Sequence, residues 1–449
     1  MRNAVTLIYN PALNAVIRPG YSVEEVRAVA SLLESNDTLR FVPLSNGLFP
    51  AAALDSNRSY TGYSYVWVRD NIHIAHAHYR TGQITVATNI LATLMKYFIK
   101  HERRFLDIIE NPSRADVPMN RPHIRFKGDS LEEIAEKWAH AQNDALGYFL
   151  WMFSKLVNEN ALAPGADQLS MLALFPAYFD AIRYWQDEDS GHWEEVRKVS
   201  ASSIGAVVAG LGELAKLLPR TGSLHHPHGI VVAADMIARL IERGRGALQS
   251  ILPAECIEPD PAKKRPYDAA LLFLIYPLQV VEGNMADRIL SDVIAHLQGE
   301  VGIRRYLGDS YWAPDYKRKV KPAQRTADVS DDLSSRDQLL TGAGQEAQWC
   351  IFDPILSCIF GMKLKSERSP EHLARQTEYL NRSLGQITGG EQTDVPAFRC
   401  PELYYFEAER LVPNDHVPLL WTQANLMLAL QFMQESYGLL QRHLQLWRL

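Results

Sequence analysis

Apolar residues recur at helical spacing along nearly the whole chain, and this periodicity constrains the fold more than any other feature. An apolar residue at every third or fourth position marks the buried face of a helix. Strand-like alternation is scarce, and its best example is residues 6–10 (TLIYN). The pattern predicts about twelve helices and an all-α protein. The predicted helical segments are 23–34, 70–81, 86–101, 131–157, 172–185, 200–217, 229–246, 267–277, 284–298, 338–361, 370–385 and 417–437.

Four long connections separate these helices and are rich in Pro, Gly, Asp and aromatic residues: 40–68, 110–130, 300–335 and 388–416. Loops of this length in an all-α protein are usually functional when they carry this many aromatic residues. No Pro/Ser linker or shift of composition divides the 449 residues. The expected organisation is therefore one domain over residues 1–449, with a short N-terminal extension over residues 1–20.

Composition excludes several classes of protein. Hydrophobic residues make up 47% of the chain and charged residues 22%, which is typical of a soluble globular protein. A net charge of −6 does not favour a nucleic-acid partner. Four unpaired-looking cysteines and the absence of a signal-peptide or membrane-spanning pattern favour a cytoplasmic protein with no membrane partner.

No cofactor and no metal ion is expected. GAGQE at 342–346 lacks a preceding strand and a third glycine, so it is a poor dinucleotide loop. His73 and His76, and the histidines of 225–228, have no further ligands nearby in the sequence, so packing or solvent roles are favoured for them. The basic run at 317–321 has no interleaved aromatic residues and is expected to be a solvated loop.

Acidic residues stand beside Trp, Tyr and Arg at several predicted junctions between a loop and a helix. Sugars offer apolar C–H faces to aromatic rings and hydroxyl groups to carboxylates and guanidinium groups, so this mixture is typical of carbohydrate sites. Any one of these residues alone is more often structural, but the recurrence of the pattern favours a binding site. The clusters are YSYVWVRDN (63–71), WAHAQND (138–144), YWQDEDSGHWEE (184–195), GIRRYLGDSYW (302–312) and RCPELYYF (399–406).

At these clusters the sequence resembles glycoside hydrolase family 15, the glucoamylase-like family, and especially the N-terminal domain of phosphorylase kinase regulatory subunits. The resemblance extends from about residue 63 to about residue 433 and follows five ordered motifs. They are W-x-R-D at 67–70, W-x-x-x-Q-x-D at 138–144, W-E-E at 193–195, R-Y at 305–306 leading to Tyr311, and P-E-L-Y at 401–404.

The resemblance implies an (α/α)6 barrel that hydrolyses terminal α-glucosidic bonds with inversion, its site lying at the loops of one end. Carried over by position, Glu194 would be the general acid and Glu402 the general base. The residues that would bind the substrate are Tyr65, Trp67, Arg69, Asp70, Trp138, Gln142, Asp144, Trp193, Glu195 and Arg305.

Trp193 is expected to help desolvate the Glu194 carboxyl and raise its pKa. The expected partner is an α-glucan or oligosaccharide, and no protein partner is identified. The alternative is a glucan-binding or regulatory protein that has kept the barrel and pocket without useful turnover. The W-E-E motif favours activity, because the kinase subunits keep only its first glutamate.

Overall fold

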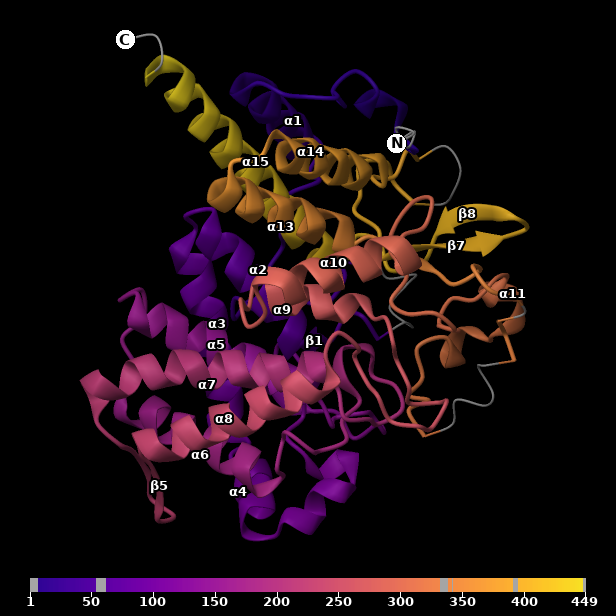
Figure 1. Cartoon of the computed structure of the whole chain (residues 1–449). Coiled ribbons are helices and arrows are strands. Elements are labelled where there is room, and N and C mark those ends of the chain that lie inside the picture. Colours follow the sequence, from indigo (N-terminus) through magenta and orange to yellow (C-terminus); the bar gives the residue numbers. More distant parts are fainter. Residues whose placement is uncertain (1–6, 54–61, 332–337, 341, 391–394, 447–449) are drawn as a thin grey trace.

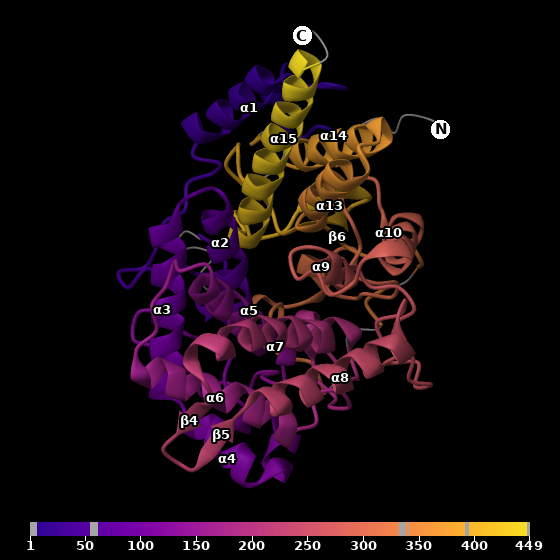
Figure 2. The ribbon, with the colours of Figure 1, turned by 60° about the vertical axis from the view of Figure 1, so that its left-hand side comes forward.

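Six helices contact one another in a closed ring around the middle of the molecule (Figure 2). The computed structural model describes residues 7–53, 62–331, 338–340, 342–390 and 395–446, with side chains as far as residue 439. Within this part of the chain each inner helix contacts the next, and the last returns to the first. In ring order they are α2 (Val68–Arg80), α5 (Asn143–Asn158), α7 (Ala201–Thr221), α9 (Leu272–Ile275), α13 (Phe352–Glu367) and α15 (Leu420–Leu446).

An outer helix covers each inner one (Figure 1). Helix α3 packs on α2, α6 on α5, α8 on α7, α10 on α9, α14 on α13 and α1 on α15. This arrangement is an (α/α)6 barrel, so the predicted fold is confirmed. The outer helices are α1 (Val23–Ser35), α3 (Ile84–Lys100), α6 (Ala166–Ala181), α8 (Ala234–Ile251), α10 (Gly283–Leu297) and α14 (Pro370–Gly385).

Burial patterns explain which helices are inner and which are outer. Helix α5 is apolar on all sides, and residues 143–154 are buried without interruption. A helix of this kind is stable only inside a protein. Helix α8 buries one stripe, formed by Ile237, Leu240, Gly244, Leu248 and Ile251, and exposes the rest. Such a stripe suits a helix with one face on the core and one face in solvent.

Two inner helices, α5 and α7, approach each other at glycines. A Cβ atom added to Gly147 would lie 2.5 Å from the backbone carbon of Ala206, and one added to Gly210 would lie 2.7 Å from the Gly147 carbonyl oxygen. These distances leave no room for a side chain between the two backbones. The glycines therefore set the spacing of the ring at this contact.

Short strands tie the loops together at one end of the barrel. β1 pairs with β2 and β2 with β3, so that Trp67 lies opposite Arg125 just before α2 begins. β6 pairs with β7, which places Trp349 opposite Leu403 just before α13. The bounds of these strands are β1 (Val66–Trp67), β2 (Arg125–Lys127), β3 (Glu132–Glu133), β6 (Gln348–Trp349), β7 (Leu403–Glu407) and β8 (Arg410–Pro413).

The remaining elements are short. A hairpin of β4 (Leu224–His226) and β5 (Ile230–Val232) lies between α7 and α8, and α4 (Arg103–Glu110) and α11 (Tyr316–Lys319) are brief helices. Segments of 3-10 helix are η1 (Pro11–Leu13), η3 (Pro112–Asp116), η4 (Pro118–Asn120), η5 (Gly191–Trp193), η6 (Ala269–Leu271) and η7 (Pro322–Gln324). Residues 7–20 pack near the end of α14, where Tyr9 stacks on Tyr404.

Some predicted elements were wrong. Residues 131–142 are not helical, because β3 pairs Glu133 with Phe126 and Arg104 holds the Glu133 carboxylate. Residues 342–351 form no helix either, since β6 belongs to a sheet. The predicted strand at 6–10 is irregular over residues 7–10, and Thr6 lies outside the described residues. Helix α4 was missed because eight residues make too short a periodic window.

Helix α7 is long and apolar enough to cross a membrane by length and composition alone. Its most apolar 18-residue window is 78% buried inside the fold. Its hydropathy is explained by its place in the inner ring.

The glycine contact between α5 and α7 predicts a large effect of a single methyl group. Gly147→Ala is expected to lower the free energy of unfolding by about 1–3 kcal/mol, because the new Cβ meets backbone that cannot move aside locally. Chemical denaturation measures the change. The matched control is Gly212→Ala in the neighbouring helix α7, where an added Cβ meets nothing within 4 Å. It should stabilise by up to about 1 kcal/mol through helix propensity, and equal effects of the two variants would contradict the packing argument.

Candidate active site

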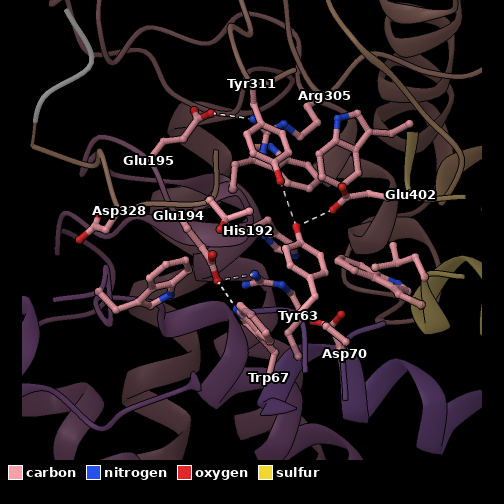
Figure 3. Close-up of a pocket in the computed structure, with 18 of the residues that line it drawn as sticks. Tyr63, Trp67, Asp70, His192, Glu194, Glu195, Arg305, Tyr311, Asp328 and Glu402 are labelled. Atoms are coloured by element: carbon pink, nitrogen blue, oxygen red, sulfur yellow. Dashed lines mark hydrogen bonds and ion pairs between the residues drawn. The ribbon is translucent and has the colours of Figure 1, made fainter. Parts of the chain in front are cut away.

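A pocket opens at the end of the barrel where the inner helices begin. Figure 3 shows the side chains that line it. Its walls come from segments that precede five of these helices or form their first turns, and the segment before α9 contributes no lining residue. The aromatic walls are Tyr63, Trp67, Trp138, Trp193, Tyr311, Trp349 and Trp421. The charged groups are Arg69, Asp70, Glu194, Glu195, Arg305, Asp328 and Glu402, and the other lining residues are Ala51, His192, Thr326, Ala327, Val329 and Leu419. Of the four long connections, 110–130 contributes none of these residues.

Glu194 stands directly after η5 in the left-handed backbone region, with φ 58° and ψ 40°. This region is unfavourable for a residue with a side chain, and such residues concentrate at functional sites. The Glu194 Oε1 atom accepts hydrogen bonds from Trp67 Nε1 at 2.8 Å and Gln142 Nε2 at 3.2 Å. The backbone turn thus aims this carboxyl at the pocket, where two side chains hold it.

Burial raises the pKa of the Glu194 carboxyl, and the nearby Arg69 and the hydrogen bonds from Gln142 and Trp67 only partly oppose it. The tryptophan that contacts this carboxyl is Trp67, not the expected Trp193. The Trp193 indole donates instead to Asp268, with Nε1 at 2.9 Å from Oδ1. Because its pKa is raised, Glu194 loses its proton at a higher pH than an exposed glutamate does.

The neighbouring Glu195 has the opposite electrostatic environment. Burial also raises the pKa of its carboxyl, but Arg305 and Arg265 outweigh burial and the net pKa is lowered. Arg305 Nη2 lies 2.9 Å from Glu195 Oε1, and the Tyr306 hydroxyl donates to the same oxygen at 2.6 Å. Two adjacent glutamates therefore differ in environment: the pKa of Glu194 is raised and that of Glu195 is lowered.

The Arg305 guanidinium is fixed by a carboxylate and by aromatic rings. Its Nε and Nη2 atoms each donate to Asp309 at 2.7 Å. Its guanidinium carbon lies 4.9 Å from the centre of the Trp349 ring and 5.2 Å from that of Trp193. Stacking between aromatic rings fixes a planar cation in one orientation. Arg305 is therefore a rigid positive group in the pocket wall.

Arg69 is positioned by two of the predicted substrate-binding residues. Its Nη1 atom donates to Asp144 Oδ2 at 2.7 Å and to Gln142 Oε1 at 2.9 Å. Gln142 and Asp144 lie outside the pocket lining, so the prediction that they contact the substrate is corrected to a positioning role. Tyr65 also lies outside the lining, where its ring packs against the Arg125 guanidinium.

Glu402 precedes β7 and is 2% exposed. Its Oε1 atom accepts a hydrogen bond from the Tyr63 hydroxyl at 2.7 Å, and its Oε2 atom accepts from Asn414 Nδ2 and lies 2.5 Å from His416 Nδ1. The Tyr63 hydroxyl in turn lies 3.1 Å from that of Tyr311. Figure 3 shows Glu402 and Glu194 on different walls of the one pocket.

Asp70 lies in the first turn of α2 and lines the pocket. Burial raises the pKa of its carboxyl from 3.8 to about 7; Arg69 lowers this pKa, and Glu194 and Glu402 add to the increase. An ionised Asp70 is therefore costly to the fold near neutral pH. A cost of this kind is expected where a carboxyl serves a ligand and not the stability of the protein.

Several pocket residues were missed from the sequence. Tyr63 and Tyr311 stand inside two of the clusters, so a wider choice within each cluster would have included them. Trp349 lies in β6 just before α13, and Trp421 lies in the first turn of α15; neither belongs to one of the five clusters. Asp328 belongs to a long connection with no periodic signal. Trp67, Arg69, Asp70, Trp138, Trp193, Glu194, Glu195, Arg305 and Glu402 are brought together as predicted.

Of the histidines for which the sequence favoured packing or solvent roles, His73 and His76 lie in the core, whereas His225 and His228 are exposed. His73 stacks on Trp421 with ring centres 4.5 Å apart, and the His76 ring packs against Trp151 at 5.3 Å. Among the described residues, no group of three or more His, Cys, Asp or Glu side chains is placed to hold a metal ion.

Comparison with known proteins gives matches over most of the chain. A family model described as glycosyl hydrolases family 15 matches residues 36–312. The uncharacterized lipoprotein YgeQ of Escherichia coli K12 is 30% identical over 205 residues, which cover 41% of this chain and 77% of that protein. The probable phosphorylase b kinase regulatory subunit alpha of Drosophila melanogaster is 23% identical over 429 residues. That match covers 87% of this chain but only 31% of the kinase subunit.

Solved structures share the fold at low sequence identity. A glycosidase variant in complex with glucose superimposes with a TM-score of 0.63 at 15% identity, covering 94% of this chain and 100% of that chain. The glucoamylase of Hormoconis resinae gives a TM-score of 0.60 at 11% identity, covering 92% of this chain and 74% of that chain. These similarities support the barrel architecture.

Asp70→Asn is expected to lower kcat/KM for an accepted substrate and to raise the melting temperature at alkaline pH. Between pH 3.8 and about 7 the folded Asp70 binds a proton more tightly than the unfolded one, so stability falls as pH rises through this window. Asparagine keeps the shape of the side chain and cannot ionise, so the variant does not lose stability in this way as the pH rises. Thermal unfolding at pH 5 and pH 8 should show the larger gain at pH 8.

The matched control is Asp180→Asn on the outer helix α6, whose side chain is 37% exposed. It should leave kinetics unchanged. A melting temperature that Asp70→Asn lowers at both pH values would mean that the ionised Asp70 stabilises the fold.

Proposed function

Because the chain belongs to glycosyl hydrolase family 15, we propose that it is an inverting, exo-acting α-glucoside hydrolase. Its expected substrates are α-glucans or maltooligosaccharides, from whose non-reducing ends it releases glucose. One observation carries the proposal: Glu194 and Glu402 line one pocket with different hydrogen-bond partners. Inverting glycosidases need one carboxyl that gives a proton and one that accepts a proton.

Glu194 suits the role of general acid. Its pKa is raised by burial, so the carboxyl can be protonated when the substrate binds. Protonation of the glycosidic oxygen by Glu194 makes the leaving sugar a neutral alcohol as the bond to the anomeric carbon breaks. Trp67 and Gln142 stabilise the carboxylate that remains, because both donate to its Oε1 atom.

Glu402 suits the role of general base. The donors around it are suited to an ionised carboxylate, which accepts hydrogen bonds at both oxygens. It would take a proton from a water molecule that attacks the anomeric carbon on the face opposite the leaving group. The product would then have the β configuration.

The other charged groups suit a clamp for the terminal glucose. Arg69, Asp70 and Arg305 offer charge-assisted hydrogen bonds to sugar hydroxyls, and such contacts strengthen as the ring flattens toward its oxocarbenium-like transition state. Trp67, Trp138 and Trp193 offer apolar faces to the ring. Residues 326–329 add a further wall, so a pocket closed in this way would admit a chain end and not the middle of a chain.

A second candidate function is glucan binding without useful turnover. It is favoured by the similarity to phosphorylase b kinase regulatory subunits over 87% of this chain. Both functions use the same pocket, and they differ in whether bound glucoside is cleaved. Incubation of the pure protein with maltose, longer maltooligosaccharides, isomaltose and glycogen, with assays of glucose release and of binding, separates them.

Glu194→Gln and Glu402→Gln are each expected to reduce glucose release by about 10²–10⁴-fold, because each removes one proton-transfer step. Glu110→Gln, whose side chain on α4 is 57% exposed, is the matched control and should retain full activity. Wild-type turnover by both pocket variants on a confirmed substrate would refute the assignment of the two glutamates.

The two roles can be told apart with α-glucosyl fluoride, because fluoride leaves without protonation. Glu194→Gln should keep most of its activity on this substrate, whereas Glu402→Gln should lose it. Proton NMR of the first product should show β-glucose. Initial release of α-glucose would contradict inversion.

A further inference from the structure

A short hairpin brings a histidine against the carboxylate of Glu402. β7 and β8 pair so that Tyr404 lies opposite Pro413, and the chain on either side continues side by side (Figure 1). The backbone N–H of Asn414 donates to the Leu403 carbonyl at 3.2 Å, and the backbone N–H of Glu402 donates to the His416 carbonyl at 3.3 Å. Residues 14 apart in sequence thus become direct neighbours.

The contact between His416 and Glu402 requires a shared proton. Nδ1 of His416 lies 2.5 Å from Glu402 Oε2. Two lone pairs cannot face each other at this distance, so one proton lies between the two atoms. A general base must be ionised, so the proton belongs on the histidine nitrogen.

Within the described part of the chain, the hydrogen bonds to Glu402 leave one acceptor position open. A carboxylate has about four lone-pair positions, two on each oxygen. Oε2 uses both of its positions on Asn414 and His416, which lie behind the pocket wall. Oε1 uses one on Tyr63, which lines the pocket, and its second position remains for a water molecule.

The imidazole ring of His416 is fixed by its surroundings. The side chain is fully buried, and its ring stacks on Tyr63 with centres 3.5 Å apart and planes 12° apart. Trp312 packs edge-on against the same ring at 5.8 Å. Nε2 has no hydrogen-bond partner among the described residues, so a proton there would be buried without an acceptor from them. This also favours the tautomer with its proton on Nδ1.

The turn that carries His416 is anchored from outside as well. Asp415 pairs with Lys317 at 2.6 Å and with Arg325 at 3.3 Å. Lys317 belongs to the basic run that the sequence suggested was a solvated loop, so this prediction was wrong for Lys317. These ion pairs hold Asn414 and His416 on the side facing Glu402.

We propose that His416 is a positioning residue for the general base: its Nδ1 proton binds Glu402 Oε2, fixes the orientation of this carboxylate and turns the free lone pair of Oε1 toward the attacking water. The inference rests on the proposed function. It predicts that the hydrogen bond of the histidine, and not the packing of its ring, matters for turnover.

Two variants of His416 separate these contributions. His416→Phe keeps a ring that can stack on Tyr63 but removes the donor. His416→Asn loses the ring but places an amide N–H near the position of Nδ1. We expect His416→Phe to lower kcat by about 10- to 100-fold with KM nearly unchanged, because misplacing a catalytic group reduces the rate of the chemical step. His416→Asn should retain most of the kcat although its melting temperature falls.

A purely structural role predicts the reverse order, with His416→Phe active and His416→Asn impaired. That order, or equal losses of kcat in the two variants, would overturn the proposal. His76→Phe is the matched control: this histidine is also buried among aromatic rings, lies outside the pocket and should leave kcat and KM unchanged.

A measurement that needs no activity tests the same geometry. Long-range nitrogen–proton NMR correlation on histidine-labelled protein reports the tautomer of His416, with His416→Asn used to assign its signal. We expect the proton on Nδ1. A proton on Nε2 alone would refute the proposal even in a protein that hydrolyses no glucoside, whereas inactivity with the expected tautomer would refute the proposed function and leave the hydrogen bond between His416 and Glu402 established.

Discussion

The common direction of the six inner helices is the constraint on which the pocket depends. All six begin at one end of the barrel, so the segments that precede them meet there although they are hundreds of residues apart in the sequence. The N-terminus of a helix carries a partial positive charge. The described pocket lining holds five carboxyl groups against two guanidinium groups. The helix ends therefore contribute to tolerating this excess of acid.

The carboxyl groups of the pocket are neutralised to different degrees by nearby arginines, and this difference gives Glu194 and Glu195 different pKa shifts. Glu195 is matched by Arg305 and Arg265 and stays ionised. Glu194 lies near Arg69, at 3.4 Å, but this guanidinium is shared with Asp144 at 2.7 Å. Because Asp144 takes the better geometry, Arg69 cannot cancel the effect of burial on Glu194. Arg69 lowers the pKa of both carboxyls, but the effect of burial is outweighed only at Asp144, so the pKa of Asp144 is lowered and that of Glu194 stays raised.

Two carboxyl groups are also held by unusual backbone. Glu194 has a positive φ, and the β7–β8 hairpin that follows Glu402 turns through Ala408 and Glu409, with φ of 46° and 63°. Two successive residues of this kind suit the right-handed twist of a two-residue hairpin, although Asn and Gly are the usual choices. The hairpin matters because its register brings Asn414 and His416 to Glu402. A shift of register would move both donors away from the carboxylate.

The sequence alone determined the class of fold and the members of most of the pocket. Helical periodicity can be read from the sequence whatever the tertiary arrangement, because it shows which side of each helix is buried. The clusters of aromatic and acidic residues identified Trp67, Trp138, Glu194 and Glu402 as pocket residues. Only the tertiary structure decided that Gln142 and Asp144 lie behind Arg69, that Trp67 rather than Trp193 contacts Glu194, and that His416 binds Glu402. The physical reason is that these relations depend on strand register, side-chain direction and burial, which are properties of pairs of segments and leave no periodic signal in either segment.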